Sequence, residues 1–156
     1  MEFNADLIDD RIWLGSFAAM QNTIALDSLH ITHILSLIES DLPIDSNDNY
    51  IRKHIRVEDI ETTDLLTEFD ACYDFILNAL TENSTNNVLI HCLVGVSRSA
   101  TIACMWLMHR YKLSVDDALK RLRNARPGVQ PNPSFTSQLY LFEQMNRQLD
   151  KKSYFI

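Results

Sequence analysis

The clearest structural signal in the chain lies in one stretch, Val88-Leu89-Ile90-His91-Cys92-Leu93-Val94-Gly95-Val96-Ser97-Arg98-Ser99-Ala100-Thr101. It begins with a short apolar run of buried-strand length, which a tight loop containing Gly95 follows. The residues from Arg98 onward predict a helix. Cys92 therefore lies at the end of a strand and Arg98 at the start of a helix, with five residues between them.

This strand–loop–helix arrangement favours a binding site for a phosphate group. The first N–H groups of a helix have no partner within the helix, and with the helix dipole they create a positive site. Gly95 permits a backbone conformation that a side chain would resist, and Arg98 offers a planar fork for two phosphate oxygens. The same surroundings would lower the pKa of the Cys92 thiol. We therefore expect a thiolate that attacks phosphorus; an inert core cysteine and a redox or sulfur-transfer loop are the alternatives.

Composition and charge narrow the class of protein. The chain has 156 residues, 46% of them hydrophobic, and few glycines or prolines, so we expect a single domain over residues 1–156. A formal net charge of −7 argues against a nucleic-acid binder or a protein held on anionic lipid. No secretory signal or membrane-spanning apolar run is visible. Cys72, Cys92 and Cys104 lack the spacing of a zinc site, and reduced thiols fit the cytoplasm or the nucleus.

Predicted strands and helices alternate along the chain. Apolar or alternating runs predict strands at 8–15 (a strand pair or an extended lead-in), 33–38, 50–57 and 88–91. Apolar spacing and capping patterns predict helices at 17–29, 65–80 and 98–111, from 114 to the Pro127-Gly128 pair, and from 132 to about 145. The helix that begins at Arg98 is apolar nearly all round, which predicts burial. The whole pattern predicts an α/β sandwich with a mainly parallel central sheet flanked by helices.

The loop resembles a known phosphate-binding motif. Its Cys92-x5-Arg98 spacing is similar to that of the cysteine-dependent protein tyrosine phosphatases, and His91-Cys92-x-x-Gly95-x-Ser97-Arg98-Ser99 resembles their dual-specificity branch. Residues 12–15, 99–108 and 126–135 resemble further segments of that family in the same order. The resemblance implies the protein tyrosine phosphatase-like sandwich and a reaction through a phosphocysteine intermediate, with no metal or other cofactor.

The resemblance also implies roles for individual residues. Cys92 would be the nucleophile, Arg98 would bind phosphate, and Ser99 would assist departure of the thiolate. His91 would tune the thiolate, and Asn132 would brace the loop from outside. The phosphate would be surrounded by the loop Leu93, Val94, Gly95, Val96, Ser97 and Arg98.

The reaction also needs an acid, because the leaving oxygen must gain a proton. Acidic residues are concentrated in 58–64, which follows a predicted strand and should therefore reach the same sheet edge as the Cys92 loop. Chemistry alone leaves four carboxylates as candidates: Glu58, Asp59, Glu61 and Asp64. The family resemblance selects Asp59 as general acid and base, whereas Asp64 is better explained as an N-cap of the next helix.

Together these features predict a protein phosphatase that hydrolyses phosphotyrosine and phosphoserine/threonine. Leu93, Val94 and Val96 make the variable loop positions apolar, whereas phosphoinositide- or RNA-directed relatives tend to carry basic or polar residues there. The expected partner is a phosphorylated protein, not nucleic acid or a membrane. The alternatives are a phosphoinositide or RNA phosphatase and a non-catalytic phospho-binding module on the same fold. The basic residues within 52–56 and 120–126 are interpreted as solvated faces.

Overall fold

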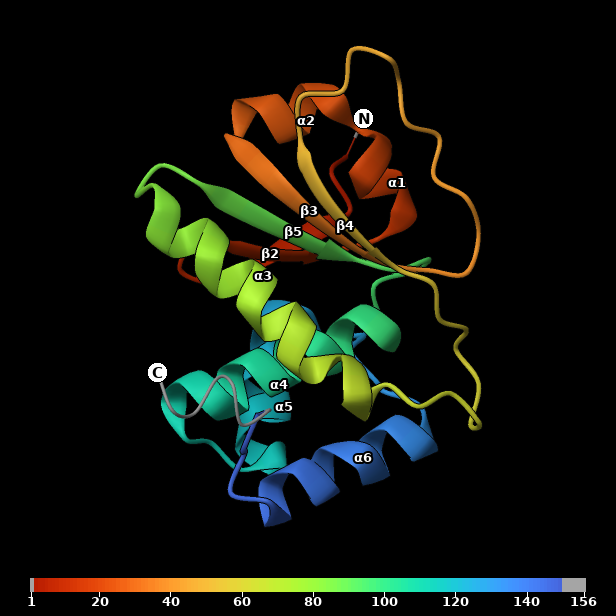
Figure 1. The fold of residues 1–156 in the computed structure, drawn as a ribbon, viewed down its shortest axis with the longest axis vertical. Coiled ribbons are helices and arrows are strands. Elements are labelled where there is room, and N and C mark those ends of the chain that lie inside the picture. Colours follow the sequence, from red (N-terminus) through yellow and green to blue (C-terminus); the bar gives the residue numbers. More distant parts are fainter. Residues whose placement is uncertain (1, 150–156) are drawn as a thin grey trace.

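The computed structural model describes residues 2–149, which form a five-stranded sheet with helices on both faces (Figure 1). The strands are β1 (Ala5–Asp9), β2 (Ile12–Gly15), β3 (Ile31–Leu37), β4 (Ile51–Ile55) and β5 (Asn87–His91). They lie in the order β1-β2-β5-β3-β4. β1 and β2 form an antiparallel pair, and the other neighbouring strands are parallel. The predicted α/β architecture with a mainly parallel sheet is confirmed.

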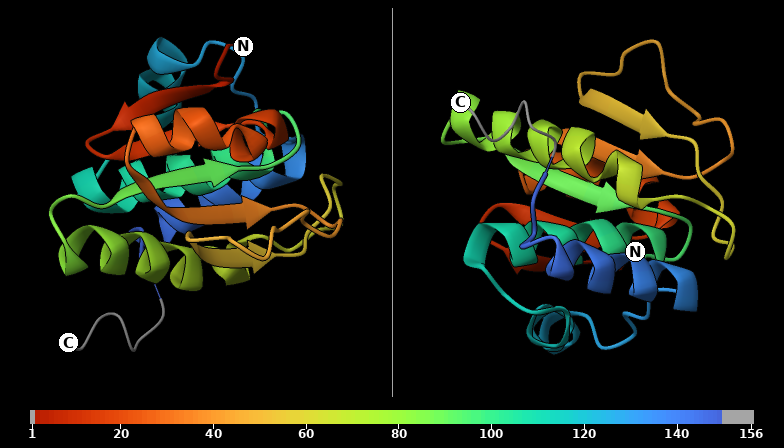
Figure 2. Two further views of the ribbon diagram at one scale, coloured as in Figure 1. Left: turned by 90° about the horizontal axis from the view of Figure 1, so that it is seen from above. Right: turned by 60° about the horizontal axis from the view of Figure 1, so that its bottom comes forward.

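The helices form three groups around the sheet. On one face lie α1 (Phe17–Gln21) and α2 (Thr23–Ser28), which are nearest the viewer in the left view of Figure 2. The other face is covered by α3 (Phe69–Glu82), which follows the 3-10 turn η1 (Leu66–Glu68), and by α4 (Arg98–Tyr111). α5 (Val115–Ala125) and α6 (Pro133–Gln144) pack against α4 from outside (Figure 1). No helix within residues 2–149 combines the length and the apolar character needed to cross a membrane.

β5 is buried on both faces because it lies in the middle of the sheet. Successive side chains of a strand point to opposite faces, so Leu89 packs in the small core beneath α1 and α2, while Val88 and Ile90 belong to the larger core. α4 crosses that larger core, and its side chains are buried from Arg98 to Met108. This explains the continuous apolar run in β5 and the all-round apolar character of α4. The burial fixes both ends of the loop between them.

Several predicted elements have different bounds in the structure. The helix predicted over 65–80 begins with the 3-10 turn η1, and its α-helical part α3 runs from Phe69 to Glu82. The helix predicted over 17–29 is interrupted at Asn22, whose side chain accepts the Ala25 N–H at 3.2 Å and starts α2. An Asn side chain that bonds nearby backbone competes with continuation of a helix. The strand predicted over 50–57 ends at Ile55. The predicted N-caps of α5 and α6 are confirmed, because Ser114 and Asn132 each accept the N–H three residues on.

The parallel arrangement brings four segments to one edge of the sheet. β2, β3, β4 and β5 run in the same direction, so their carboxyl ends meet there. The segments that leave this edge begin at Ser16, Ile38, Arg56 and Cys92. Ligand sites of open α/β sheets lie outside the carboxyl ends of the strands. The residues predicted to form the site are therefore delivered to one place by segments far apart in sequence.

Candidate active site

The loop of residues 92–97 is held by hydrogen bonds to its carbonyl oxygens from outside. Phe17 N–H donates to the first of them, Leu93 O, at 2.9 Å, and Gln130 N–H donates to Val96 O at 2.8 Å. The two carbonyls between them, at residues 94 and 95, both accept from Arg126, at 3.0 and 2.9 Å. These four contacts hold the loop from outside, and the Gly95 N–H, which interacts with the Cys92 thiol, faces its interior.

Gly95 is required by this geometry. Its φ is +73°, in the region that favours glycine, and a Cβ at this position would lie only 2.6 Å from the carbonyl oxygen of Gly15. The same Cβ would lie 2.7 Å from the Arg126 guanidinium. Any side chain at Gly95 would therefore displace either the end of β2 or the arginine that binds the loop.

Arg126 corrects an interpretation made from the sequence. The sequence pattern places it on a solvated basic face, but its side chain is only 11% exposed and pairs with Asp6 at 2.9 Å. Its other guanidinium contacts are Asn4 and the two loop carbonyls. Arg123 also bonds a carbonyl, that of Val129. The sequence pattern missed the role of Arg126 because its guanidinium contacts join residues at least 31 positions apart in the chain.

Cys92 lies at the base of the loop and is 2% exposed. Its Sγ is 3.0 Å from the Ser99 Oγ, in the first turn of α4. Burial of the thiol opposes ionisation, but the Ser99 hydroxyl, the N–H groups of Ser99 and Gly95 and the Arg98 charge together outweigh it. The pKa of Cys92 therefore lies below its usual value. A thiolate with a lowered pKa is the reactive form of cysteine.

Arg98 is the first residue of α4, and its side chain is 6% exposed. Its Nη1 donates to the Glu39 carboxylate and, at 3.0 Å, to the Val57 carbonyl. Its Nε is buried and has no hydrogen-bond partner among residues 2–149. Glu39 was not among the residues singled out in the sequence, because nothing in its local pattern distinguishes it from a solvated loop charge.

Asp59 lies against the far end of the same loop. Its Oδ1 accepts from the Ser97 hydroxyl at 2.7 Å and from the Asn132 side-chain amide at 3.0 Å. The Asn132 backbone N–H in turn donates to Ser97 Oγ at 2.9 Å, and the Asn132 Oδ1 caps α6. Three residues from three segments thus form one cluster with the carboxylate exposed to solvent. Asp64, by contrast, accepts the Thr67 N–H at 3.2 Å within the 3-10 turn η1, but the N-cap position of α3 is Glu68, so the predicted N-cap role of Asp64 for that helix is wrong.

His91 precedes the nucleophile candidate and is fully buried. Its Nε2 is 2.6 Å from Ser36 Oγ, and its Nδ1 is 3.0 Å from the Cys92 carbonyl oxygen. Burial lowers the pKa of His91 to about 4, against the opposing effect of the Cys92 carbonyl. The imidazole is therefore neutral at pH 7, and it connects Cys92 to β3 through hydrogen bonds.

Three other arginines form ion pairs with carboxylates. Arg52 forms an ion pair with Asp48 at 2.7 Å, and Arg56 pairs with Asp41 at 2.8 Å. Arg121 pairs with Asp9. Within residues 2–149 there is no cluster of three His, Cys, Asp or Glu side chains able to hold a metal ion. At the loop itself, positive potential for an anion comes from Arg98 and from the amide groups at the start of α4.

Comparison with known proteins gives the same class as the fold and the loop. The model of the dual specificity phosphatase catalytic domain matches residues 12–145. Dual specificity protein phosphatase 1 of Arabidopsis thaliana is 38% identical over 145 residues, which cover 93% of this chain and 72% of that protein. The crystal structure of DUSP15 is 28% identical, with a TM-score of 0.87 over 94% of this chain and 92% of that one. The Yvh1 phosphatase domain from Chaetomium thermophilum is 27% identical, with a TM-score of 0.86 over 94% and 99% of the two chains.

The structure and these similarities define a cysteine-dependent phosphatase fold. Within that class, the chain belongs to the dual specificity phosphatase catalytic domain family. It is accordingly a dual-specificity protein phosphatase, an enzyme of the hydrolase class.

Proposed function

We propose that the protein hydrolyses phosphotyrosine and phosphoserine/threonine in protein substrates through a phosphocysteine at Cys92. The observation that carries this proposal is the arrangement around one loop. Cys92 Sγ lies 3.0 Å from Ser99 Oγ at its base, and Asp59 is held over its far end. The buried Nε of Arg98 has no hydrogen-bond partner within the described part of the chain. A nucleophile, an anion site and a proton donor are thereby combined.

In the first step, the Cys92 thiolate attacks phosphorus. The S–P bond forms as the bond from phosphorus to the leaving oxygen breaks, and Asp59 gives its proton to that oxygen. Arg98 and the loop amide groups bind the three equatorial oxygens, whose charge they stabilise in the transition state. The products of this step are the dephosphorylated side chain and phosphocysteine.

In the second step, water hydrolyses the phosphocysteine. Asp59, now ionised, takes a proton from the water as its oxygen attacks phosphorus, and the S–P bond breaks. The electron pair returns to sulfur, where the Ser99 hydroxyl stabilises the departing thiolate through a hydrogen bond. Inorganic phosphate leaves and the enzyme is restored.

The loop surroundings favour a protein substrate over a phosphoinositide or RNA. Leu93 and Val94 are 54% and 56% exposed, so the loop presents apolar rather than basic side chains. The neighbouring charged side chains Glu39 and Asp59 are acidic, and the formal net charge is −7. A polyanionic lipid headgroup or RNA would be repelled by these charges. The three free cysteines support action in the cytoplasm or the nucleus.

The test combines a small aryl phosphate with three substrate panels: phosphopeptides carrying phosphotyrosine or phosphothreonine, phosphoinositides, and RNA triphosphate. We expect turnover of the aryl phosphate and the peptides, no effect of a chelator, and complete loss on Cys92→Ser. Asp59→Ala should slow turnover by about 100-fold or more while phosphate still binds. Preferred hydrolysis of the phosphoinositide or RNA would overturn the substrate assignment. Phosphopeptide binding without turnover by the unaltered protein would indicate a binding module instead.

A further inference from the structure

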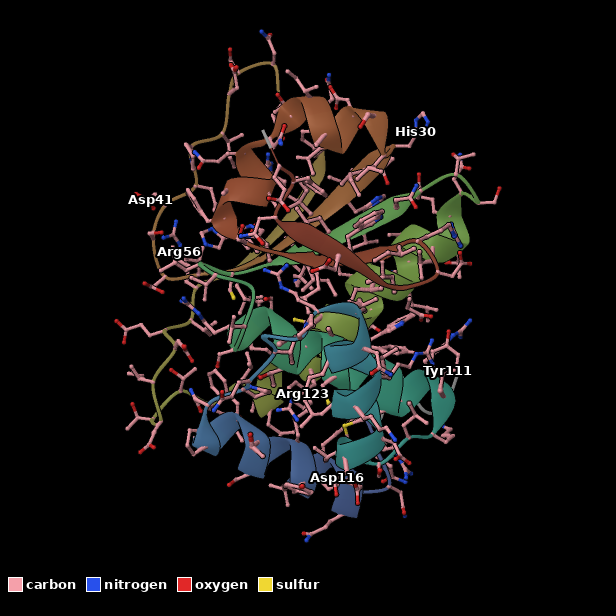
Figure 3. The ribbon with its side chains drawn as sticks, turned by 180° about the vertical axis from the view of Figure 1, so that it is seen from behind. His30, Asp41, Arg56, Tyr111, Asp116 and Arg123 are labelled. Atoms are coloured by element: carbon pink, nitrogen blue, oxygen red, sulfur yellow. The ribbon has the colours of Figure 1, made fainter. Side chains whose placement is uncertain are left out.

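Glu39 occupies a fixed position beside the phosphate loop although it lies outside any strand or helix. The residue before it is anchored twice to β4, because Ile38 N–H donates to Ile55 O at 3.1 Å and His54 Nε2 lies 2.8 Å from Ile38 O. The Glu39 carbonyl itself accepts from Arg56 at 3.2 Å. Asp41 pairs with that same arginine, and the two lie together at this edge (Figure 3). The backbone at Glu39 is therefore held by β4 and the residue that follows it.

The Glu39 carboxylate binds only one nitrogen, Nη1, of the Arg98 guanidinium. Nη1 is shared between Glu39 and the Val57 carbonyl, so this nitrogen faces the protein. The opposite edge of the guanidinium, formed by Nε and Nη2, is the planar fork that can hold two oxygens of an oxyanion. Nε is buried without a partner among residues 2–149. A buried donor is costly to leave unpaired, and a phosphate oxygen in the loop would satisfy it.

We propose that Glu39 is a positioning residue: it holds Arg98 Nη1 so that the Nε edge faces the bound phosphoryl group. This inference rests on the proposed function of the same loop. Long arginine side chains lose rotamer freedom when they bind, and a partner that fixes the side chain beforehand reduces that loss. Glu39 thus contributes to phosphate affinity without touching the phosphate.

The opposite role, in which Glu39 competes with phosphate for Arg98, predicts a different sign. A competitor must be displaced, so its removal would tighten phosphate binding. The geometry favours positioning because Glu39 and Val57 together occupy Nη1 and leave Nε open. The two roles are separated by one measurement of phosphate affinity.

The experiment measures binding of inorganic phosphate by its protection of Cys92 from alkylation with iodoacetamide, an uncharged reagent. Glu39→Gln removes the charge that holds Arg98. Asp41→Asn is the matched control, because it makes the same chemical change at a 91% exposed carboxylate two residues away that pairs with Arg56 and not with Arg98. We expect Glu39→Gln to raise the phosphate Kd about tenfold, because one charge-assisted hydrogen bond at a partly exposed site is lost. Glu39→Asp keeps the charge and should restore part of the affinity. Asp41→Asn should stay within about twofold.

Two further readouts separate positioning from general damage. The alkylation rate without phosphate serves as the reference for each variant, because the Arg98 charge also affects the pKa of Cys92. The thermal unfolding midpoint should be unchanged in Glu39→Gln, because Glu39 lies outside the hydrophobic core. An unchanged or lower phosphate Kd in Glu39→Gln would overturn the proposal, and so would an equal rise in Asp41→Asn. A different result would show that the proposed function is wrong: the unaltered protein would bind phosphate but would not hydrolyse an aryl phosphate.

Discussion

His91 should make the stability of this protein depend on pH between about 4 and 6.5. The side chain is fully buried, and mainly this burial lowers its pKa from 6.5 to about 4. In the unfolded chain the imidazole regains a pKa near 6.5. Between these two values the unfolded state binds the proton and the folded state does not, so stability falls as the pH is lowered through this window.

The size of the effect follows from the two pKa values. When the pH is lowered from 7.5 to 5, a histidine whose pKa is 6.5 in the unfolded chain and about 4 in the folded protein lowers the free energy of unfolding by about 2 kcal/mol. Below pH 4 both states are protonated, and the loss from this residue reaches its limit. His33 and His109 also have pKa values lowered by burial, and they add to the trend with the same sign. A variant is therefore needed to isolate His91.

The assay is urea unfolding at pH 7.5, 6 and 5, monitored by tryptophan fluorescence. His91→Gln should be less stable than the unaltered protein at all three pH values. Its free energy of unfolding should, however, decrease by about 2 kcal/mol less between pH 7.5 and pH 5. His30→Asn is the control, because His30 is exposed with a φ of +56° that asparagine tolerates, and it should keep the full fall. If His91→Gln and the unaltered protein fell equally, within about 0.5 kcal/mol, the reasoning on a buried neutral imidazole would be wrong.

Three other substitutions test the scaffold of the site. Asn132→Ala removes a helix cap and the amide that holds Asp59, so it should cost about 1 kcal/mol in urea unfolding and lower kcat for an aryl phosphate about tenfold, with phosphate affinity retained; an unchanged kcat would exclude the link to Asp59. Gly95→Ala should raise the phosphate Kd at least tenfold in the Cys92 protection assay, because it forces a side chain into a space of 2.6 Å at positive φ, and normal binding would show that the loop tolerates the shift. Arg126→Lys keeps the charge but loses the fork that binds two loop carbonyls, so it should raise KM more than it lowers kcat and destabilise by about 1–2 kcal/mol; equal kinetics would refute a bracing role.

The parts of the fold predictable from sequence are those encoded by local patterns. The apolar run before Cys92, Gly95 in the loop and the buried helix after it predict a strand, a turn and a helix start, and each is present. The parallel orientation of most strands follows from the alternation of strands with helices along the chain. The position of Asp59 came from the family resemblance, and the structure brings it to the loop through Ser97 and Asn132. Its catalytic role stays a prediction, as does the single-domain assignment.

The parts that could not be predicted depend on contacts between distant segments. Glu39 meets Arg98 across 59 residues, and Arg126 meets the carbonyl at position 94 across 32. Their own neighbourhoods resemble ordinary charged loops and helix ends, so no local spacing marks them. The break at Asn22 is a different case, because side-chain capping of α2 competes with a helix whose apolar spacing continues across it. In each case tertiary or capping interactions decide what the pattern leaves open.

The central claim is that the phosphoryl group passes through Cys92, and rapid quench in acid tests it most directly. The protein is mixed with an excess of an aryl phosphate and quenched within the first turnover, and the peptide that contains Cys92 is examined by mass spectrometry. We predict phosphate on Cys92, formed at least as fast as kcat and absent in Cys92→Ser. Steady turnover of the substrate with no phosphate ever found on Cys92 would contradict the mechanism.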